Sequence, residues 1–465
     1  MATRDRRVAY FTHMNNQDRI IVKDAPKFDL ELYIANYRGR TRFDRLLLIG
    51  QCSVPLCIDA LKLAMAEAKR GKDTQRYRDA WECIRIAAPH EPEAVFDDAW
   101  VAATEKSNHA ERHRLEAELK GYKNNLVKES IRIGHRDLGE HLESTGDLNG
   151  AAETYIKMRP DASTQAHIQD VGKHAIGIMI QKRDWSGVLS NVNKVLSPNT
   201  SEDQNPEQPY QKMVVGLAEL GSNKYYEAAG SFLEVGDLSK CQQLNDIASP
   251  NDVATYGGLL ALASMDRLEL QSRVLENTNF RNYLELEPHV RKAVSMFVNG
   301  RYSSCLEILE SYRSDYLLDY YLQAHVPEIF SRIRSKCIVQ YFLPFSCVTL
   351  DSMNATFAKP GESIEGELVS MIRKGVLNAR INTIDKLLVA VSTNSRVAMQ
   401  QKALTAAKNY QKEAIERIRR MNIVAADLEV KAPRKGGNGG GSGISGVGEL
   451  WSDDNRRQLA GDVIG

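Results

Sequence analysis

The sequence lacks long apolar runs and an excess of charge of either sign. No apolar stretch approaches the roughly 20 residues that a membrane-spanning helix needs, and no apolar segment follows the basic start Met1–Arg7, as it would in a secretion signal. The 61 Lys and Arg residues nearly balance the 60 Asp and Glu residues, which leaves a net charge of +1. A protein that coats nucleic acid is strongly basic. We therefore expect neither a membrane protein nor a protein of that kind.

Motifs that carry chemistry are also scarce. There is no Walker phosphate-binding loop, no Gly-x-Ser-x-Gly nucleophile elbow and no His-x-His pair. The nearest metal motif is His109-Ala-Glu-Arg-His113, in which Ala110 occupies the position of the catalytic Glu of zinc proteases. The seven cysteines are scattered, as reduced core thiols are in an intracellular protein. We predict no catalytic residue, no metal and no cofactor.

A degenerate helix–turn–helix unit is what the sequence does contain. Each copy has a polar or glycine turn, a bulky lead residue, small or apolar residues three and four positions later, and a further bulky residue at plus seven. The lead residues are Leu148, Trp185, Tyr225 and Tyr302. Their separations are 37, 40 and 77 residues, and a weaker copy at Leu268, with Leu275 seven positions later, fits the double interval. A period near 40 predicts an α-solenoid, which offers a long surface to partners and rarely carries chemistry.

The sequence predicts a mainly α fold with six parts. The α-solenoid of TPR-like helix pairs is preceded by helices and followed by a winged-helix subdomain and one long C-terminal helix. The predicted boundaries are 1–27 for a flexible N-terminus, 28–130 for the N-terminal helical region, 131–335 for the helical repeats, 336–392 for the winged helix, 393–430 for the C-terminal helix and 431–465 for a disordered Gly-rich tail.

The winged helix follows from a change of hydrophobic period beyond the repeats. A short helix is predicted over 349–357, and a second helix begins at Ser363 and ends at Gly375, a residue suited to a left-handed stop. Alternating apolar residues over 377–381, a turn and an apolar return strand over 386–391 predict a β-hairpin. Two helices followed by a hairpin are typical of a winged helix.

The C-terminal helix is predicted over about 395–430. Its apolar residues recur at alternating steps of three and four: Leu404, Ala407, Ala414, Ile418, Met421, Ala425 and Leu428. This period is typical of a helix that packs along other helices. Glycine dominates 435–448, which predicts a flexible linker.

A winged helix that binds nucleic acid is the alternative from a different class of function. Its recognition helix would be Ser363–Lys374, and Glu362, Glu365 and Glu367 stand at the start of that helix. Base and phosphate contacts are usually made there, and carboxylates repel the phosphates that supply most of the affinity. The sequence therefore argues against direct binding of nucleic acid.

Long strings of the sequence resemble the PCI family, whose members scaffold the proteasome lid, the COP9 signalosome and translation initiation factor three. The strings are Tyr122–His141, Ser249–Ala263, Asp266–Gln271, Phe280–Val290, Glu367–Ile381 and Lys386–Leu388. They are similar to a subunit of the COP9 signalosome, and the resemblance covers roughly 28–430. The paralogous lid subunit of the proteasome is the second candidate.

The resemblance implies a non-catalytic scaffold subunit. The COP9 signalosome removes the ubiquitin-like modifier Nedd8 from cullin–RING ubiquitin ligases, and a different, zinc-containing subunit carries the isopeptidase activity. The implied partners are other signalosome subunits and, through the complex, cullin–RING ligases, with no nucleic acid and no membrane bound directly. The implied location is the cytoplasm and the nucleus.

In such complexes the winged helices pair edge to edge and the C-terminal helices gather in one bundle. A hairpin has an unpaired edge, and a strand from a neighbour satisfies its backbone groups. We therefore expect the strand 386–391 and the segment 346–349 to form the pairing sheet. The predicted interface residues are Ser346, Cys347, Val348, Lys386, Leu387, Leu388, Val389, Leu404, Ile418, Met421 and Leu428. Packing in the chain's own core is the alternative for each of them.

Overall fold

The computed structural model describes residues 2–195, 208–236, 246–358, 363–391, 395–426 and 428. It divides into two compact units, Met1–Val391 and Ser392–Gly465, and each is described by itself. The predicted Gly-rich tail, 431–465, lies outside the described residues, as does Glu362. The described part of the chain is mainly helical, with one small sheet.

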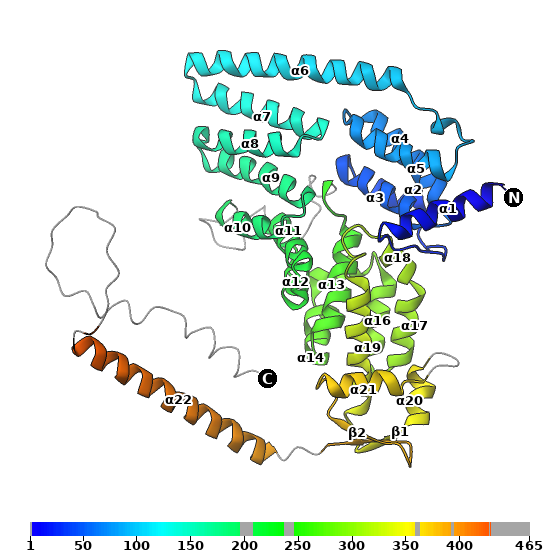
Figure 1. The fold of residues 1–465 in the computed structure, drawn as a ribbon, viewed down its shortest axis with the longest axis vertical. Coiled ribbons are helices and arrows are strands. Elements are labelled where there is room, and N and C mark those ends of the chain that lie inside the picture. The colour runs from blue at the N-terminus through cyan, green and yellow to red at the C-terminus, as the bar shows by residue number, and fades with distance from the viewer. Residues whose placement is uncertain are drawn as a thin grey trace. The chain divides into compact units, whose positions relative to one another are not determined.

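The first unit begins with a group of short helices (Figure 1). They are α1 (Ala2–Asn16), α2 (Leu30–Ala35), α3 (Gly39–Cys52), α4 (Cys57–Arg70) and α5 (Thr74–Ala87). The prediction of a loose N-terminus is wrong for α1, because its Tyr10, Phe11 and Met14 are buried against apolar residues of α4 and α5. Three buried apolar residues are enough to hold this mostly polar helix in place, because α1 packs on a core that other helices already form.

A stack of helix pairs follows, in which each helix packs on the next. Figure 1 shows its first four helices lying one above another. The helices are α6 (Asp98–Asn125), α7 (Lys128–Thr145), α8 (Leu148–Met158), α9 (Gln165–Gln181), α10 (Trp185–Val195), α11 (Gln208–Gly221), α12 (Tyr225–Leu233) and α13 (Pro250–Ser264). The predicted α-solenoid is confirmed by this arrangement.

The four lead residues of the repeat are each the first residue of a helix, namely of α8, α10, α12 and α17 (Tyr302–Ser311). The residue two positions earlier has a positive φ in every case: Gly146, Arg183, Asn223 and Gly300. The next N–H then donates to the carbonyl five residues back, as from Asp147 to Leu142 at 3.0 Å and from Arg301 to Met296 at 2.8 Å. This is the Schellman ending of a helix. One turn therefore sets the angle between the helices of each pair.

The weaker copy at Leu268 does not share this geometry. The helix α14 (Arg267–Glu269) starts from a capping box at Asp266 and continues as the π-helical turn η6 (Leu270–Leu275). Leu268 is 80% exposed. The helical period placed a lead residue here, but the local capping turned its side chain to solvent.

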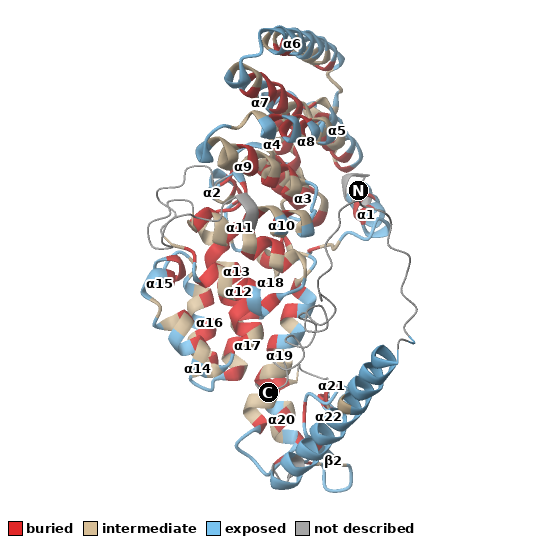
Figure 2. Cartoon of the chain, turned by 90° about the vertical axis from the view of Figure 1, so that its left-hand side faces the viewer, coloured by how far each residue is buried: buried red, intermediate tan, exposed pale blue. Residues whose placement is uncertain are grey.

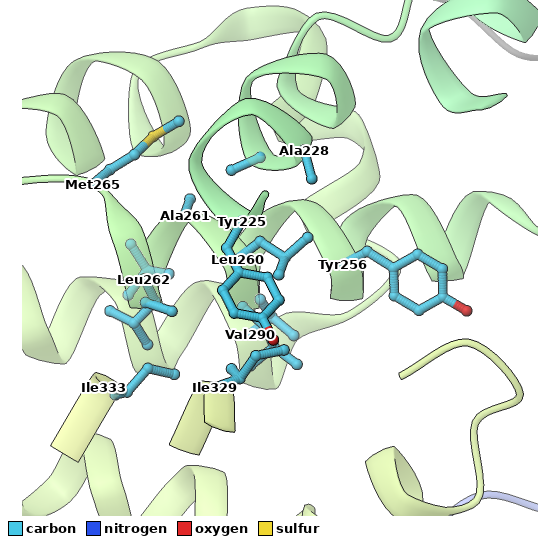
Figure 3. Packing of buried hydrophobic residues seen from close by; sticks show 14 of the residues in the cluster. Tyr225, Ala228, Tyr256, Leu260, Ala261, Leu262, Met265, Val290, Ile329 and Ile333 are labelled. Atoms are coloured by element: carbon cyan, nitrogen blue, oxygen red, sulfur yellow. The ribbon is translucent and has the colours of Figure 1, made fainter. Parts of the chain in front are cut away.

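The remaining helices cover α13. They are α15 (Thr278–Leu284), α16 (Pro288–Val298), α17, α18 (Arg313–Leu317) and α19 (Val326–Phe342). Eleven of the fifteen residues of α13 are buried, and Figure 3 shows Leu260, Leu262 and Val290 beside Ile329 and Ile333 of α19. A Cβ on Gly258 would lie 2.3 Å from Val290 Cγ1, so the close approach of α16 to α13 requires glycine.

A buried arginine joins the N-terminal helices to this core. Arg45 of α3 is fully buried; it donates to Asp319 Oδ2 at 2.7 Å and to Asp252 Oδ2 at 2.9 Å. Its guanidinium also lies 4.0 Å from the ring centroid of Tyr37. A charge without water needs such partners. Arg45 therefore fixes α3 against α13 and the segment after α18.

The first unit ends in the winged helix. Its elements are β1 (Cys347–Thr349), α20 (Leu350–Phe357), α21 (Glu365–Arg373), β2 (Ala379–Asn382) and β3 (Leu387–Ala390). Thr349 caps α20 and Gly375 has the predicted positive φ, while the cap position of α21 is Ile364, one residue beyond the expected cap at Ser363. The winged-helix prediction is confirmed.

The second unit contains α22 (Ser395–Ala425), a single helix of 31 residues. At 1.5 Å per residue it is about 46 Å long. Figure 2 shows it almost entirely in the colour of exposed residues.

Candidate assembly interface

The sheet of the winged helix has two open edges. Its strand order is β1-β3-β2, with β3 antiparallel to both neighbours. The backbone of β3 is thus paired on both sides. The sequence predicted that the strand 386–391 and the segment 346–349 belong to one sheet, and β3 and β1 do pair in it; the open edges of that sheet lie on β1 and β2 and not on β3. Within the described residues, the outer sides of β1 and β2 carry no further strand.

The register shows which backbone groups of β1 face outward. Ser346 O accepts from Ala390 N at 2.8 Å, and Leu350 N donates to Lys386 O at 2.8 Å. Backbone groups alternate along an antiparallel strand, so the N–H and C=O of Cys347 point away from β3. On the other side Val391 N donates to Asn378 O, and the same alternation leaves the groups of Ile381 on the free edge of β2.

The side chains of the predicted sheet residues divide between core and surface. Val348 and Leu388 are buried in the core of the first unit. Ser346, Cys347, Lys386 and Val389 are exposed, and Leu387 is half-buried. Exposed Leu343 and Phe345 precede β1. Val348 and Leu388 are register partners within the sheet, so their backbone groups as well as their side chains are used inside this chain, whereas the exposed side chains of the others can contact a partner directly.

The edge residue Ile381 was missed by the sequence reasoning. Its alternation with Leu377 and Ala379 placed it in a strand, but alternation does not show the order of strands in a sheet. Only the pairing of β1 with β3 makes β2 an outer strand. Exposed Arg380, a charged residue on this edge, is typical of an edge protected against indiscriminate pairing.

An ion pair holds the winged helix to the last solenoid helix. Arg334 Nε of α19 donates to both carboxylate oxygens of Glu367 at 2.9 and 3.0 Å, and its Nη2 donates to Phe357 O at 2.8 Å. Glu367 is one of the carboxylates at the start of α21. Its role is thus structural. Glu365, in the same first turn, is exposed, so the helix start still presents an unfavourable surface to phosphates.

The long helix carries an exposed apolar stripe. Its exposed large apolar residues include Leu404, Ile418 and Met421, and Leu428 just beyond the helix end is exposed as well. Leu404 is 61% exposed and Met421 is 68% exposed. The charged residues Lys408, Lys412, Glu416 and Arg419 occupy other positions of the helical wheel. Such a stripe on one face of a long helix is the pattern of a bundle helix.

The described residues contain no group of three or more His, Cys, Asp and Glu side chains placed to hold a metal ion. His109 and His113 lie exposed on α6. Where residues are described, no helix has the length and apolar content to cross a bilayer.

Comparison with known proteins places the chain in a class. The family model described as PCI domain matches residues 309–391, which end with the winged helix. A second model, described as 26S proteasome subunit RPN7, matches residues 97–273 in the helical stack. The fold and these matches define a PCI-domain protein.

The curated relatives narrow this class. COP9 signalosome complex subunit 1 of Neurospora crassa is 49% identical over 434 residues, which cover 93% of this chain and 95% of the relative. The subunit 1 of Arabidopsis thaliana is 37% identical over 90% of this chain and 94% of the relative. A 26S proteasome non-ATPase regulatory subunit 6 from Oryza sativa is 21% identical over 61% of this chain. The chain belongs to the COP9 signalosome complex subunit 1 family.

Proposed function

We propose that this chain is a non-catalytic scaffold subunit of the COP9 signalosome. The observation that carries the proposal is the similarity to subunit 1 proteins along nearly the whole length of both chains. The two open sheet edges and the exposed stripe of α22 support it, because a scaffold subunit needs surfaces that neighbours complete.

The complex would remove Nedd8 from cullin–RING ubiquitin ligases in the cytoplasm and the nucleus. A different, zinc-containing subunit would perform the isopeptidase step. This chain would bind the other subunits and reach the ligases through the complex.

Assembly would use the sheet edges and the helix in different ways. At the edges, a neighbour's strand or loop would pair with the outward backbone groups of Cys347 or Ile381. At α22, the stripe containing Leu404, Ile418, Met421 and Leu428 would enter a shared helical bundle. The edge would supply direction and register through hydrogen bonds, whereas the bundle would supply most of the buried apolar area.

The first experiment is purification of the tagged chain from its own cells, with mass spectrometry and a cullin-deneddylation assay on the eluate. We expect the other signalosome subunits to co-elute with the chain and Nedd8 to be released from cullins. Deletion of residues 340–430 should abolish both. Recovery of the chain without other subunits would contradict the scaffold function.

Point variants separate the two surfaces. Ile418→Asp with Met421→Asp places charges in the stripe and should abolish co-purification. Arg420→Asp is the matched control, because it lies two positions along from Ile418 on the other side of the helix. Retention of all subunits by the stripe variant would refute the bundle contact.

Proline substitution tests the edges. Cys347→Pro removes an outward N–H and leaves the bonds to β3 intact, so it should weaken co-purification without lowering the melting temperature. Ile381→Pro removes an outward N–H at the other edge, but it also removes a side chain that packs on the core, so its co-purification is compared with that of Ile381→Ala. If neither proline variant changes co-purification, strand pairing at the edges is wrong.

The proteasome lid is the second candidate assembly. The match of the RPN7 model to residues 97–273 and the 21% identity to a proteasome subunit fit a paralogue of the signalosome subunit, since the identity to the Neurospora crassa subunit 1 is 49%. Proteasome subunits in the eluate, with no deneddylation, would select this alternative.

A further inference from the structure

A cavity of about 400 Å³ lies within the first unit, apart from the sheet edges. Four segments meet around it: the chain before and within α2, the start of α13, the start of α16, and the segment from Tyr312 to Leu322. Cavities of this size are typical of binding sites for small molecules and single side chains.

The wall of the cavity is rich in carboxylates. Asp252 and Asp319 share one counter-charge, the guanidinium of Arg45. Glu287 and Asp315 form no ion pair with a lysine or arginine side chain within the described residues. Glu287 accepts from Asn251 Nδ2 at 2.8 Å, and Asp315 accepts from the backbone N–H of Lys27 at 2.9 Å. Burial raises the pKa of both carboxyl groups, as expected for negative charges that lack a full counter-charge.

Two buried polar atoms of the same wall lack a hydrogen-bond partner. The hydroxyl of Tyr316, a residue only 3% exposed, is one of them, and His289 Nε2 is the other. Burial lowers the pKa of His289 to about 4, so the ring is neutral. Its Nδ1 lies 3.3 Å from a Glu287 carboxylate oxygen, a contact that favours the tautomer with the proton on Nδ1 and an acceptor at Nε2.

The wall is also aromatic. The ring of His289 stacks on Tyr312 at 3.8 Å between centroids, and Tyr33 and Phe28 line the cavity as well. The ammonium of Lys27 lies 3.9 Å from the centroid of the Tyr312 ring. The Tyr312 ring is thus already in contact with Lys27 and His289, so the carboxylates and not this ring would bind a ligand.

We propose that this cavity binds the guanidinium group of an arginine side chain presented by a partner protein. The cavity offers two carboxylates and the further acceptors of Tyr316 and His289. A guanidinium has a planar array of donors that matches such a set of acceptors. An anion would be repelled by Glu287 and Asp315. A metal ion is disfavoured because these side chains form no metal-ligating group in the described part of the chain.

The test uses the full-length chain and the peptide Ac-Gly-Gly-Arg-Gly-Gly-amide, with binding measured by titration calorimetry. The same peptide with citrulline keeps the shape and loses the charge, and we expect it to bind at least about tenfold more weakly, because hydrogen bonds to charged groups are the stronger ones. Saturable binding of the arginine peptide with this preference supports the site. No binding at millimolar peptide, or equal binding of the two peptides, overturns it.

Variants locate the site. Glu287→Gln and Asp315→Asn keep the shape of the wall and should each weaken binding of the arginine peptide about tenfold. Glu285→Gln is the matched control, since Glu285 is an exposed carboxylate two residues away and should leave binding unchanged. Tyr316→Phe removes the hydroxyl without opening a cavity, so it should weaken binding while the melting temperature stays the same or rises. Equal losses in Glu285→Gln and Glu287→Gln would place binding elsewhere.

Discussion

Helices α13 and α22 both carry long apolar patterns, yet their surroundings are opposite. In α13 eleven residues are buried under helices of the same chain. In α22 the large apolar residues, Leu404 and Ile418 among them, are exposed. An apolar pattern therefore shows that a face will be covered, but it does not show whether the chain itself or a partner covers it.

Charge placement distinguishes the two helices. α13 has a single charged residue, Asp252, which is buried and paired with Arg45. α22 carries many charges beside its stripe, including Lys408, Glu416 and Arg419. A helix that is apolar all round belongs in a core, whereas a helix with one polar face keeps that face in water after its stripe is covered.

The largest effect on the isolated chain is expected from Arg45→Ala, which removes the charge that neutralises Asp252 of α13. Breaking a buried pair in this way costs about 3–5 kcal/mol of unfolding free energy. Urea denaturation measures it. Arg420→Ala in α22 is the control and should change the value by less than about 0.5 kcal/mol. A small loss for Arg45→Ala would mean that water reaches the two carboxylates.

The same apolar deletion in the two helices tests the comparison directly. Leu260→Ala in α13 should cost about 2–5 kcal/mol of unfolding free energy, because it leaves a cavity in the core. Leu404→Ala in α22 should change the free energy by less than about 0.5 kcal/mol, and its effect should appear as weaker co-purification. Equal losses of stability in the isolated chain would contradict the difference in burial.

Acid should weaken the core around α13 more than the surface of α22. The pKa of His289, at the start of α16, is lowered to about 4, while an unfolded histidine titrates near 6.5. The unfolded chain thus binds the extra proton first, and stability falls as pH drops from about 6.5 toward 4, by up to about 1.4 kcal/mol per pH unit.

Denaturation at pH 7 and pH 5.5 measures this slope. His289→Phe should reduce it without abolishing it, because burial also lowers the pKa of His135, His141 and His325. Glu287 and Asp315 near His289 have raised pKa values and act in the opposite direction at lower pH. The range 395–425 of α22 contains no histidine, so no histidine of that helix contributes to the effect of acid. An unchanged slope in His289→Phe would show that this ring is not buried neutral.

The smallest effect is expected at the cap of α13. Ser249 and Asp252 form a capping box, and Ser249→Ala should cost about 1 kcal/mol of unfolding free energy. Ser249→Gly should cost only a few tenths. If neither variant loses stability, the side-chain cap contributes little.

Local features of this fold could be predicted from sequence. The lead residues Leu148, Trp185, Tyr225 and Tyr302 start helices because a bulky residue after a turn is a local signal. Ser249 and Gly375 act as cap and stop for the same reason, since their roles depend on neighbouring backbone groups. The winged helix and the long C-terminal helix could be predicted because the hydrophobic period of the sequence changes where each of them begins.

Features that join distant segments could not be predicted. Arg45 pairs with residues 207 and 274 positions away, and no local pattern identifies either partner. The central position of β3 depends on β1, a three-residue strand too short to show alternation. Burial of Tyr10 depends on a surface formed by α3 to α5. Whether the predicted interface residues touch partners stays a prediction, because only other chains can complete that surface.

The buried guanidinium of Arg45 has a consequence for synthesis of the chain. Its carboxylate partner Asp319 emerges 274 residues later, which takes roughly 14–55 s at 5–20 residues per second. During that interval the Arg45 guanidinium of α3 cannot yet be buried between both of its carboxylate partners. Docking of α3 onto α13 is therefore expected only after residue 319 has emerged, because earlier docking would bury a charge that lacks one of its two partners.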